Sequence, residues 1–178
     1  AMTDKMMKRV RAKGRGWVFT PKHFIDFGTR GSVDMALSRL AQAGEIRRIG
    51  RGLYDYPQLH DKLGALTPDA EMIAQAVSAQ SGDKLAPSAA AAANRLGLST
   101  QVPARTSYAT TGRTRVSKAA GRSVTLKHSR APVLGHASVV ANGVVQLLAG
   151  LGRDKVDADA ISQLAARLDA KDVEALLK

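Results

Sequence analysis

The sequence predicts an α+β fold that is mainly helical, and three features support this prediction. Alanine-rich stretches with apolar side chains at three- and four-residue spacing recur along most of the chain and favour closely packed helices. Segments around 45–56 and 105–130 instead alternate apolar or β-branched residues with polar ones, which is typical of strands. The 178 residues suffice for one medium domain or two small ones. We expect two, at 2–57 and 68–178, joined by a linker at 58–67.

The first domain is expected to open with a short helix and an extended segment. Residues 2–13 predict the helix, with Met6, Met7 and Val10 turned inward and basic side chains around the rest of its surface. Residues 17–19 predict the extended segment, which can pair with a later hairpin and place its tryptophan in the core.

A second helix is predicted between Thr20 and Gly28. Thr20 can cap it, and Pro21 suits its first position because the missing N–H would have no partner there. Gly28 stops it. Its inward side chains are expected to be Phe24, Ile25 and Phe27.

A third helix is predicted to start at Ser32, as its cap, and to end at Gly44. Its apolar face has helical spacing: Val33, Ala36, Leu37, Leu40 and Ala43. Its opposite face can contact base edges: Asp34, Met35, Ser38, Arg39 and Gln42. A hairpin with a glycine-rich turn and arginines at its tip follows at 45–56. This order is that of a winged helix-turn-helix, so it predicts double-stranded DNA as the partner.

The charge of the chain also favours a polyanionic partner. The net charge is +12, from 27 Lys and Arg against 15 Asp and Glu. Residues 1–60 carry 12 basic and 5 acidic side chains, residues 61–135 carry 10 and 4, and residues 136–178 carry 5 and 6. The basic surplus therefore lies on the first three quarters of the chain, where it would attract nucleic acid; a merely solvated basic surface is the alternative.

The expected DNA contacts fall into two groups. The recognition-helix region supplies Arg30, Ser32, Met35, Ser38, Arg39 and Gln42. The hairpin and the first helices supply phosphate contacts: Lys8, Arg9, Arg11, Lys22, Arg47, Arg48 and Arg51. Arg39, with Arg30 at the start of the helix, can offer two donors to guanine O6 and N7 in a major groove.

The second domain is expected to be helical with a small antiparallel sheet. Helices are predicted at 69–81 and 89–96, a short strand at 84–86, and two or three antiparallel strands at 105–130. This last stretch contains no Asp or Glu. Its basic side chains are expected on one sheet face or its rim: Arg105, Arg113, Arg115, Lys118, Arg122, Lys127 and Arg130. They could be a solvated face, a second phosphate-binding surface, or a docking surface for an acidic protein.

Helices are predicted from Ser138 to the end of the chain. The first is rich in valine and leucine, the second is capped by Asp157 or Asp159, and the third is capped by Asp169. In the last two of these helices, the side chains expected to face inward are Ile161, Leu164, Ala165, Leu168, Val173, Leu176 and Leu177.

The sequence holds no pattern typical of a catalytic or metal site. The histidines His23, His60, His128 and His136 have no second histidine or carboxylate at metal-ligand spacing, and there is no cysteine. The pair Asp157 and Asp159 is spaced like metal ligands, but helix capping explains it. We therefore expect a protein that is not an enzyme and needs no cofactor or metal. Without cysteine or a membrane-length apolar run, a cytoplasmic location is expected.

Two segments resemble the AbiEi-like antitoxins of type IV toxin–antitoxin systems. They are S-V-D-M-A-L-S-R-L-A-Q-A-G-E-I-R-R-I-G-R-G-L-Y-D-Y-P and A-N-R-L-G-L-S-T-Q-V-P. The second, within Ala92–Pro103, is the more specific, since winged helices occur in many regulators. Residues that match the family's recognition-helix region are Arg30, Ser32, Ser38 and Arg39, and those that match its wing are Arg47, Arg48 and Arg51. Asn94 and Thr100 in the second segment are expected to brace a helix end.

The resemblance implies a bacterial antitoxin that binds its own promoter and counters a nucleotidyltransferase-like toxin. The expected function is therefore a sequence-specific transcriptional autorepressor and antitoxin, with inverted repeats bound by two molecules. The alternatives are an antitoxin that binds an acidic toxin through residues 105–130, or a regulator without a toxin partner. RNA binding through the same sheet is disfavoured, because only Tyr108 is available there for base stacking.

Overall fold

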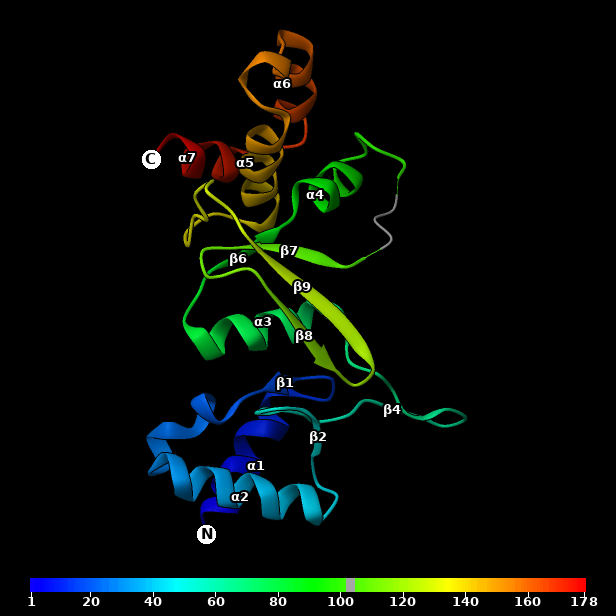
Figure 1. The fold of residues 1–178 in the computed structure, drawn as a ribbon, viewed down its shortest axis with the longest axis vertical. Coiled ribbons are helices and arrows are strands. Elements are labelled where there is room, and N and C mark those ends of the chain that lie inside the picture. The colour runs from blue at the N-terminus through cyan, green and yellow to red at the C-terminus, as the bar shows by residue number, and fades with distance from the viewer. Residues whose placement is uncertain (102–104) are drawn as a thin grey trace. The chain divides into compact units, whose positions relative to one another are not determined.

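The computed structural model describes residues 1–101 and 105–178 and shows a mixed α/β chain with small sheets (Figure 1). Helices outweigh strands, as predicted. The chain forms two compact units. The first comprises Ala1–Gly82 together with Ser117–Ser123, and the second comprises Asp83–Val116 and Val124–Lys178. Within the described part of the chain, no helix has the length and apolar character needed to cross a bilayer.

The first unit holds four helices and two small sheets among its described elements. In chain order these are α1 (Met2–Lys13), β1 (Val18–Phe19), the 3₁₀ helix η1 (Pro21–Phe27), α2 (Arg30–Gln42), β2 (Arg47–Gly50), β3 (Leu53–Asp55), β4 (Leu59–His60), β5 (Gly64–Ala65) and α3 (Ala70–Ser81). The larger sheet has the order β1-β3-β2, with both pairs antiparallel. The predicted pairing of the extended segment with the hairpin is thus confirmed, with Val18 opposite Asp55. The segment expected as a linker contains the exposed hairpin β4–β5.

The core of the first unit lies between α1, η1, α2 and the three-stranded sheet. Its buried members are Met6, Met7, Val10, Phe19, Phe24, Val33, Ala36, Leu37, Leu40, Ile46 and Tyr54. Trp17 is partly buried against this cluster, 4.7 Å from Phe19 between ring centroids, which agrees with its predicted place in the core. The predicted inward faces of α1 and α2 are confirmed, except that Ala43 lies beyond the end of α2 and is exposed.

Two local predictions in this unit are wrong. The second helix is a 3₁₀ helix, in which residues three apart share a side, so Phe24 and Phe27 face the core while Ile25 is 54% exposed. The third helix begins at Arg30 and not after Ser32, because Thr29 is its cap: the Thr29 hydroxyl accepts the Ser32 amide at 3.3 Å.

The second unit is built from a four-stranded sheet and helices. Its elements are β6 (Leu85–Pro87), α4 (Ala89–Arg95), β7 (Ser107–Thr110), β8 (Arg115–Ala119), β9 (Arg122–His128), α5 (Val139–Leu151), η2 (Arg153–Lys155), α6 (Ala158–Ala165) and α7 (Ala170–Leu177). The sheet order is β6-β7-β9-β8. β6 and β7 are antiparallel, but β7 and β9 are parallel, with Ser107 opposite Thr125. The prediction of a wholly antiparallel sheet is therefore wrong: β8 reverses the chain, so β9 runs in the direction of β7.

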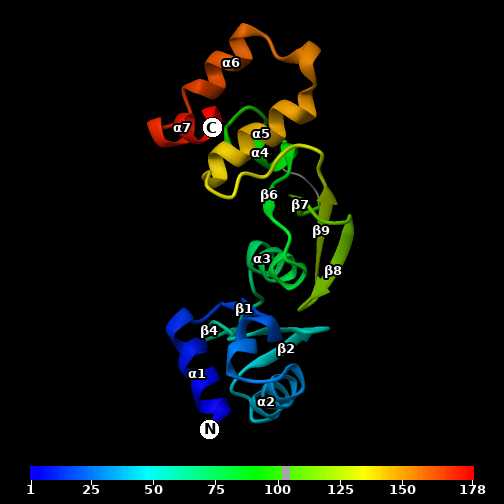
Figure 2. The same ribbon diagram turned by 90° about the vertical axis from the view of Figure 1, so that its left-hand side faces the viewer.

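Helices α4 and α5 pack closely in the second unit (Figure 2). The small side chains of α4 permit this, since a Cβ added to Gly143 would lie 3.3 Å from that of Ala92. Leu96, Val144, Leu147 and Leu164 complete this cluster. The predicted caps Asp157 and Asp169 are confirmed, accepting amides of Ala160 and Asp172 at 2.8 Å.

The last two helices bury less of their surface than the sequence predicts. Each has only eight residues. Of the side chains expected inward, Leu164 is buried, whereas Ile161 is 54% and Val173 41% exposed, and Ala165 and Leu177 are also exposed. The apolar positions on such short helices do not all reach one neighbour, so the inward prediction is wrong for these four.

Candidate nucleic-acid interface

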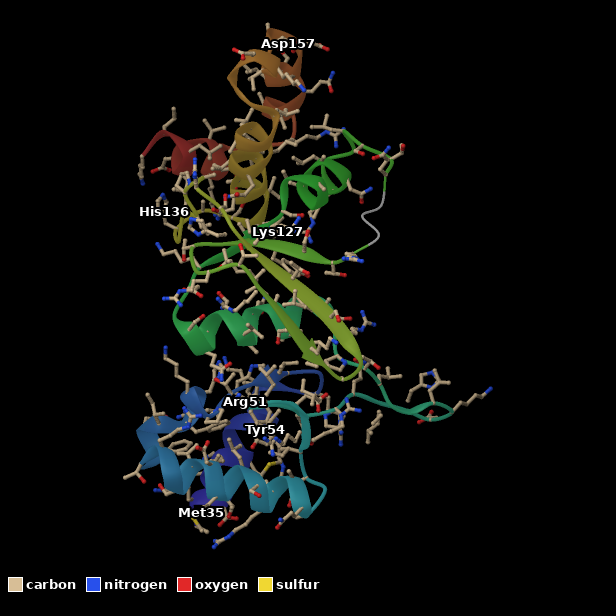
Figure 3. All side chains as sticks on the ribbon, viewed as in Figure 1. Met35, Arg51, Tyr54, Lys127, His136 and Asp157 are labelled. Atoms are coloured by element: carbon tan, nitrogen blue, oxygen red, sulfur yellow. The ribbon has the colours of Figure 1, made fainter. Side chains whose placement is uncertain are left out.

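The outer face of α2 is polar because the apolar side chains of the helix are used on its inner face. Val33, Leu37 and Leu40 are buried, and the residues between them point outward. Figure 3 shows Met35 on the outer side of α2, where it is 59% exposed. Other exposed side chains of the predicted recognition surface are Arg30, Ser38, Arg39 and Gln42, while Ser32 is half-buried at the helix start.

This face of α2 and the β2–β3 hairpin line a common groove of about 640 Å³. From α2 come Arg30, Asp34, Ser38, Ala41 and Gln42; the other lining residues are Pro21, Arg48, Arg51, Gly52, Tyr54 and Gln80. The structure therefore brings together five predicted contact residues from two elements. Met35 and Arg39 lie outside this groove, further around the exposed side of the same helix.

The positive charge in the groove comes from arginines that differ in whether they form an ion pair within the protein. Arg48 and Arg51 are exposed and form no ion pair with any described residue; Arg51 is labelled in Figure 3. Arg30 pairs with Asp34 one turn later at 3.0 Å, but both side chains are about half exposed. Such a pair contributes only about 0.3–0.5 kcal/mol, so a phosphate can compete for Arg30.

Arg47, predicted as a wing contact, is held inside its own unit. Its guanidinium binds both carboxylate oxygens of Asp55, at 3.0 and 2.6 Å, and also donates to the Leu66 carbonyl at 2.8 Å. Asp55 is only 1% exposed, and its hydrogen bond raises the pKa of Arg47. This arginine stabilises the sheet, so we leave it out of the interface.

Arg9 on α1 is likewise held by partners within its own unit. It binds Asp26 through two nitrogens at 2.8 and 2.6 Å, donates to the His23 carbonyl, and stacks 4.1 Å from the Phe27 ring centroid. That contact with Arg9 lowers the pKa of Asp26. Arg11 has an exposed pair with Glu45 at 3.2 Å. Lys8 and Lys22 are exposed and form no ion pair with a described residue.

The capping box at the start of η1 includes the half-buried His23. The Thr20 amide donates to its Nδ1 at 3.1 Å. Burial lowers the pKa of His23, a Thr20 backbone hydrogen bond opposes this, and the neighbouring cations Lys13, Arg9 and Lys22 lower it further. The lowered pKa favours the neutral form of His23, whose Nδ1 is used in the capping box.

The groove is also lined by residues that the two groups of predicted DNA contacts omit. Tyr54 is buried in β3 and lines the groove, and Asp34, which was expected on the outer face of the helix, is the ion-pair partner of Arg30. Gln80 comes from α3, and a Cβ on Gly52 would lie 3.0 Å from its Nε2. Periodicity indicated that Asp34 is exposed, but no local signal links Gln80 to a hairpin turn almost thirty residues earlier.

The residues of the predicted second basic surface are divided between the two units. Lys118 and Arg122 lie in the part of the hairpin that belongs to the first unit, whereas Arg105, Arg113, Arg115 and Lys127 belong to the second. Arg115 forms an ion pair with Asp83 at 2.9 Å. Strand alternation also places Arg115 and Lys118 on opposite faces of β8. Lys127 and Arg130, which lies beyond β9, line one pocket of the second unit.

The described part of the second family-like segment is a helix end held by its asparagine. The Asn94 side chain donates to the Ser99 and Gln101 carbonyls at 3.2 and 3.5 Å, so its predicted bracing role is confirmed. Thr100 is exposed. Val102 and Pro103 of the quoted motif lie outside the described residues.

Residues 1–101 and 105–178 contain no group of three or more His, Cys, Asp or Glu side chains that could hold a metal ion. Asp157, half of the acidic pair with metal-like spacing, caps α6. The four histidines each take part in a hydrogen bond: His60 Nδ1, for example, accepts the amides of Lys62 and Leu63.

Among known proteins, the chain is similar to a protein family. Neither the curated proteins nor the solved structures contain a match to this chain. A family model described as a family of unknown function, DUF6088, matches residues 5–176 and so covers both units. The chain belongs to the DUF6088 family.

Proposed function

We propose that this chain binds double-stranded DNA in a sequence-specific way and regulates transcription. In this proposal the first unit acts as a winged helix-turn-helix: η1 and α2 are the two helices, and β2–β3 is the wing. The observation that carries the proposal is the groove of about 640 Å³, in which the polar face of α2 meets two unpaired arginines of the hairpin. A polar helix face beside a basic ribbon is the arrangement that positions a helix in a major groove.

The residues divide into two roles by their chemistry. Ser38, Arg39 and Gln42 are exposed on α2 and can bond base edges, with arginine suited to guanine and glutamine to adenine. Arg48 and Arg51 supply sequence-independent phosphate contacts. Met35 can contact a thymine methyl group, and Lys8, Arg11 and Lys22 extend the basic surface over α1 and η1.

The test is a selection from randomised duplexes followed by titration of variants. We expect one enriched motif, and we expect Arg39→Ala or Gln42→Ala to weaken binding by about 1–3 kcal/mol and to relax preference at one position. Arg51→Ala should weaken binding to all sequences alike. Absence of any enriched motif, together with unchanged binding in Arg39→Ala/Arg48→Ala, would contradict the proposal.

The physiological form of the proposal is an autorepressor that serves as an antitoxin. Its support is the resemblance of residues 32–57 and 92–103 to AbiEi-like antitoxins. In that role the protein would bind inverted repeats in its own promoter and counter a nucleotidyltransferase-like toxin. Co-expression with the neighbouring gene tests it: the chain should rescue growth if that gene is toxic, and failure to rescue would leave a regulator without a toxin partner.

A further inference from the structure

The edge of the first unit's sheet is covered by a segment from far along the chain. The sheet order β1-β3-β2 leaves β2 at the edge, where backbone groups lack a strand partner within that sheet. The segment Ser117–Ser123, which joins β8 to β9, belongs to the first unit and lies against this edge. We call it the hairpin tip.

One hydrogen bond and one close approach place the hairpin tip on β2 just before the wing turn. The Ala120 amide donates to the Ile49 carbonyl at 2.9 Å. A Cβ added to Gly50 would lie 3.0 Å from the Lys118 carbonyl oxygen and 3.7 Å from the Ala119 Cβ. Ala119 itself is 2% exposed. Glycine at position 50 therefore permits a backbone approach that any side chain would hinder.

The backbone of the hairpin tip is unusual at the point of contact. Ala120 has φ 49°, the sole positive φ at a non-glycine residue among those described, and Gly121 follows with φ 76°. Two successive positive φ angles suit a tight hairpin turn, but alanine adopts this conformation reluctantly. A strained residue that donates the docking hydrogen bond indicates a segment held in place by its surroundings.

Two exposed cations lie next to the docked residues. Lys118 and Arg122 flank the docked residues and are both exposed, and neither forms an ion pair with a described residue. The Lys118 backbone touches Gly50, the neighbour of Arg51 in the wing turn. Lys118 and Arg122 therefore lie near the same end of the hairpin β2–β3 as Arg48 and Arg51. These two arginines form no ion pair with a described residue.

We propose that the hairpin tip is a third part of the DNA-binding surface, in which Lys118 and Arg122 bind phosphates of the duplex beside the wing. This inference rests on the proposed DNA-binding function and assigns these two cations to it, apart from Arg105, Arg113, Arg115 and Lys127 of the second unit. Because the tip carries no groove-entering element, its contribution is sequence-independent affinity.

The salt dependence of binding to a labelled duplex of mixed sequence tests the inference on the full chain. Each phosphate contact contributes about 0.9 to the slope of log K against log salt, so Lys118→Ala/Arg122→Ala should lower that slope by about 1.8. The affinity ratio of wild type to variant should then shrink about 12-fold between about 50 and about 200 mM salt. The matched control is Arg113→Ala/Lys127→Ala, which also removes two exposed charges but from the second unit, and it should leave the slope unchanged.

The outcomes separate this inference from the proposed function. If wild type does not bind the duplex, DNA binding itself is wrong. If wild type binds and Arg51→Ala lowers the slope while Lys118→Ala/Arg122→Ala does not, the function stands and the inference is overturned. An equal loss in both double variants would also overturn it, since the effect would then be one of net charge. Unchanged unfolding monitored at Trp17 shows that the double variant is folded.

Discussion

At the scale of single residues, neighbouring arginines of one strand have opposite roles. Arg47 and Arg48 are adjacent in β2, so strand alternation sends them to different sides. Arg47 meets the buried carboxylate of Asp55 and the Leu66 carbonyl, whereas Arg48 is exposed in the groove. From the sequence alone, Arg47 and Arg48 carry the same charge and are assigned the same role.

This difference predicts that Arg47→Met destabilises the first unit while Arg48→Met does not. Removing Arg47 leaves the carboxylate of Asp55 without its ion-pair partner. For a fully buried pair this lowers the free energy of unfolding by about 3–5 kcal/mol. We expect about 3 kcal/mol here, because Arg47 is one-third exposed. Urea unfolding monitored by Trp17, the single tryptophan, measures it. Adding Asp55→Asn to Arg47→Met should recover part of the loss. Arg48→Met should keep stability and lose DNA affinity; equal destabilisation by both would contradict the assignment.

His23 predicts the direction of a pH effect on stability. Burial lowers its pKa in the folded state, so the unfolded state binds more protons below its ordinary value of about 6.5. The contribution of His23 is therefore fully present above that pH and is lost as the pH falls through it. His23→Gln keeps a side chain able to complete the capping box with Thr20. This variant should show a smaller fall in unfolding free energy between pH 7 and pH 5; an identical fall would exclude His23 as the cause.

At the scale of elements, apolar periodicity predicted the positions of helices more accurately than the sequence predicted how strands pair. The helices α1, α2, α4 and α5 follow from apolar spacing and caps, so they were expected with bounds close to the observed ones. The inward Asp55 was not expected, because β3 is the central strand and all three of its residues are buried. The parallel pairing of β7 with β9 depends on how the chain returns after β8, which no local pattern encodes.

The candidate site was predicted in the same uneven way. Ser38, Gln42, Arg48 and Arg51 were expected and line one groove, because a helix face and a turn are local features. The partners that remove Arg9 and Arg47 from the surface are Asp26 and Asp55, which come from other elements. The place of Lys118 and Arg122 depends on docking across about seventy residues of sequence, which no periodicity reveals.

The close approach at Gly50 leads to a prediction for the element that it contacts. Gly50→Ala places a Cβ 3.0 Å from the Lys118 carbonyl oxygen, so the hairpin tip must shift, at a cost of about 1–3 kcal/mol. The hydrogen bond from the Ala120 amide should weaken, and its exchange with solvent should become faster. Amide hydrogen exchange measures this, with Gly31→Ala as control, since a Cβ there meets nothing within 4 Å. Unchanged protection of Ala120 would show that the tip is not held by this contact.

At the scale of the whole molecule, the first unit is interrupted in sequence, but the core cluster between its first helices and its three-stranded sheet comes from one continuous stretch. All the buried members of its core cluster lie between Met6 and Tyr54, whereas the Leu66 carbonyl and α3 come later. Arg47 binds that carbonyl, and α3 packs on β1. The unit should therefore be able to fold from a continuous piece of chain, provided that the piece extends through Gly82.

Two fragments test this organisation and the hairpin tip together. Residues 1–82 should unfold cooperatively at Trp17, whereas residues 1–57 should be less stable, because Arg47 loses the Leu66 carbonyl and β1 loses its contact with α3. The longer fragment still lacks Lys118 and Arg122 and exposes the edge of β2. Its DNA binding should thus show a salt slope about 1.8 below that of the full chain if the second unit adds no phosphate contacts of its own. A slope equal to that of the full chain would mean that the hairpin tip contributes nothing to binding, and equal stability of the two fragments would place the boundary at residue 57.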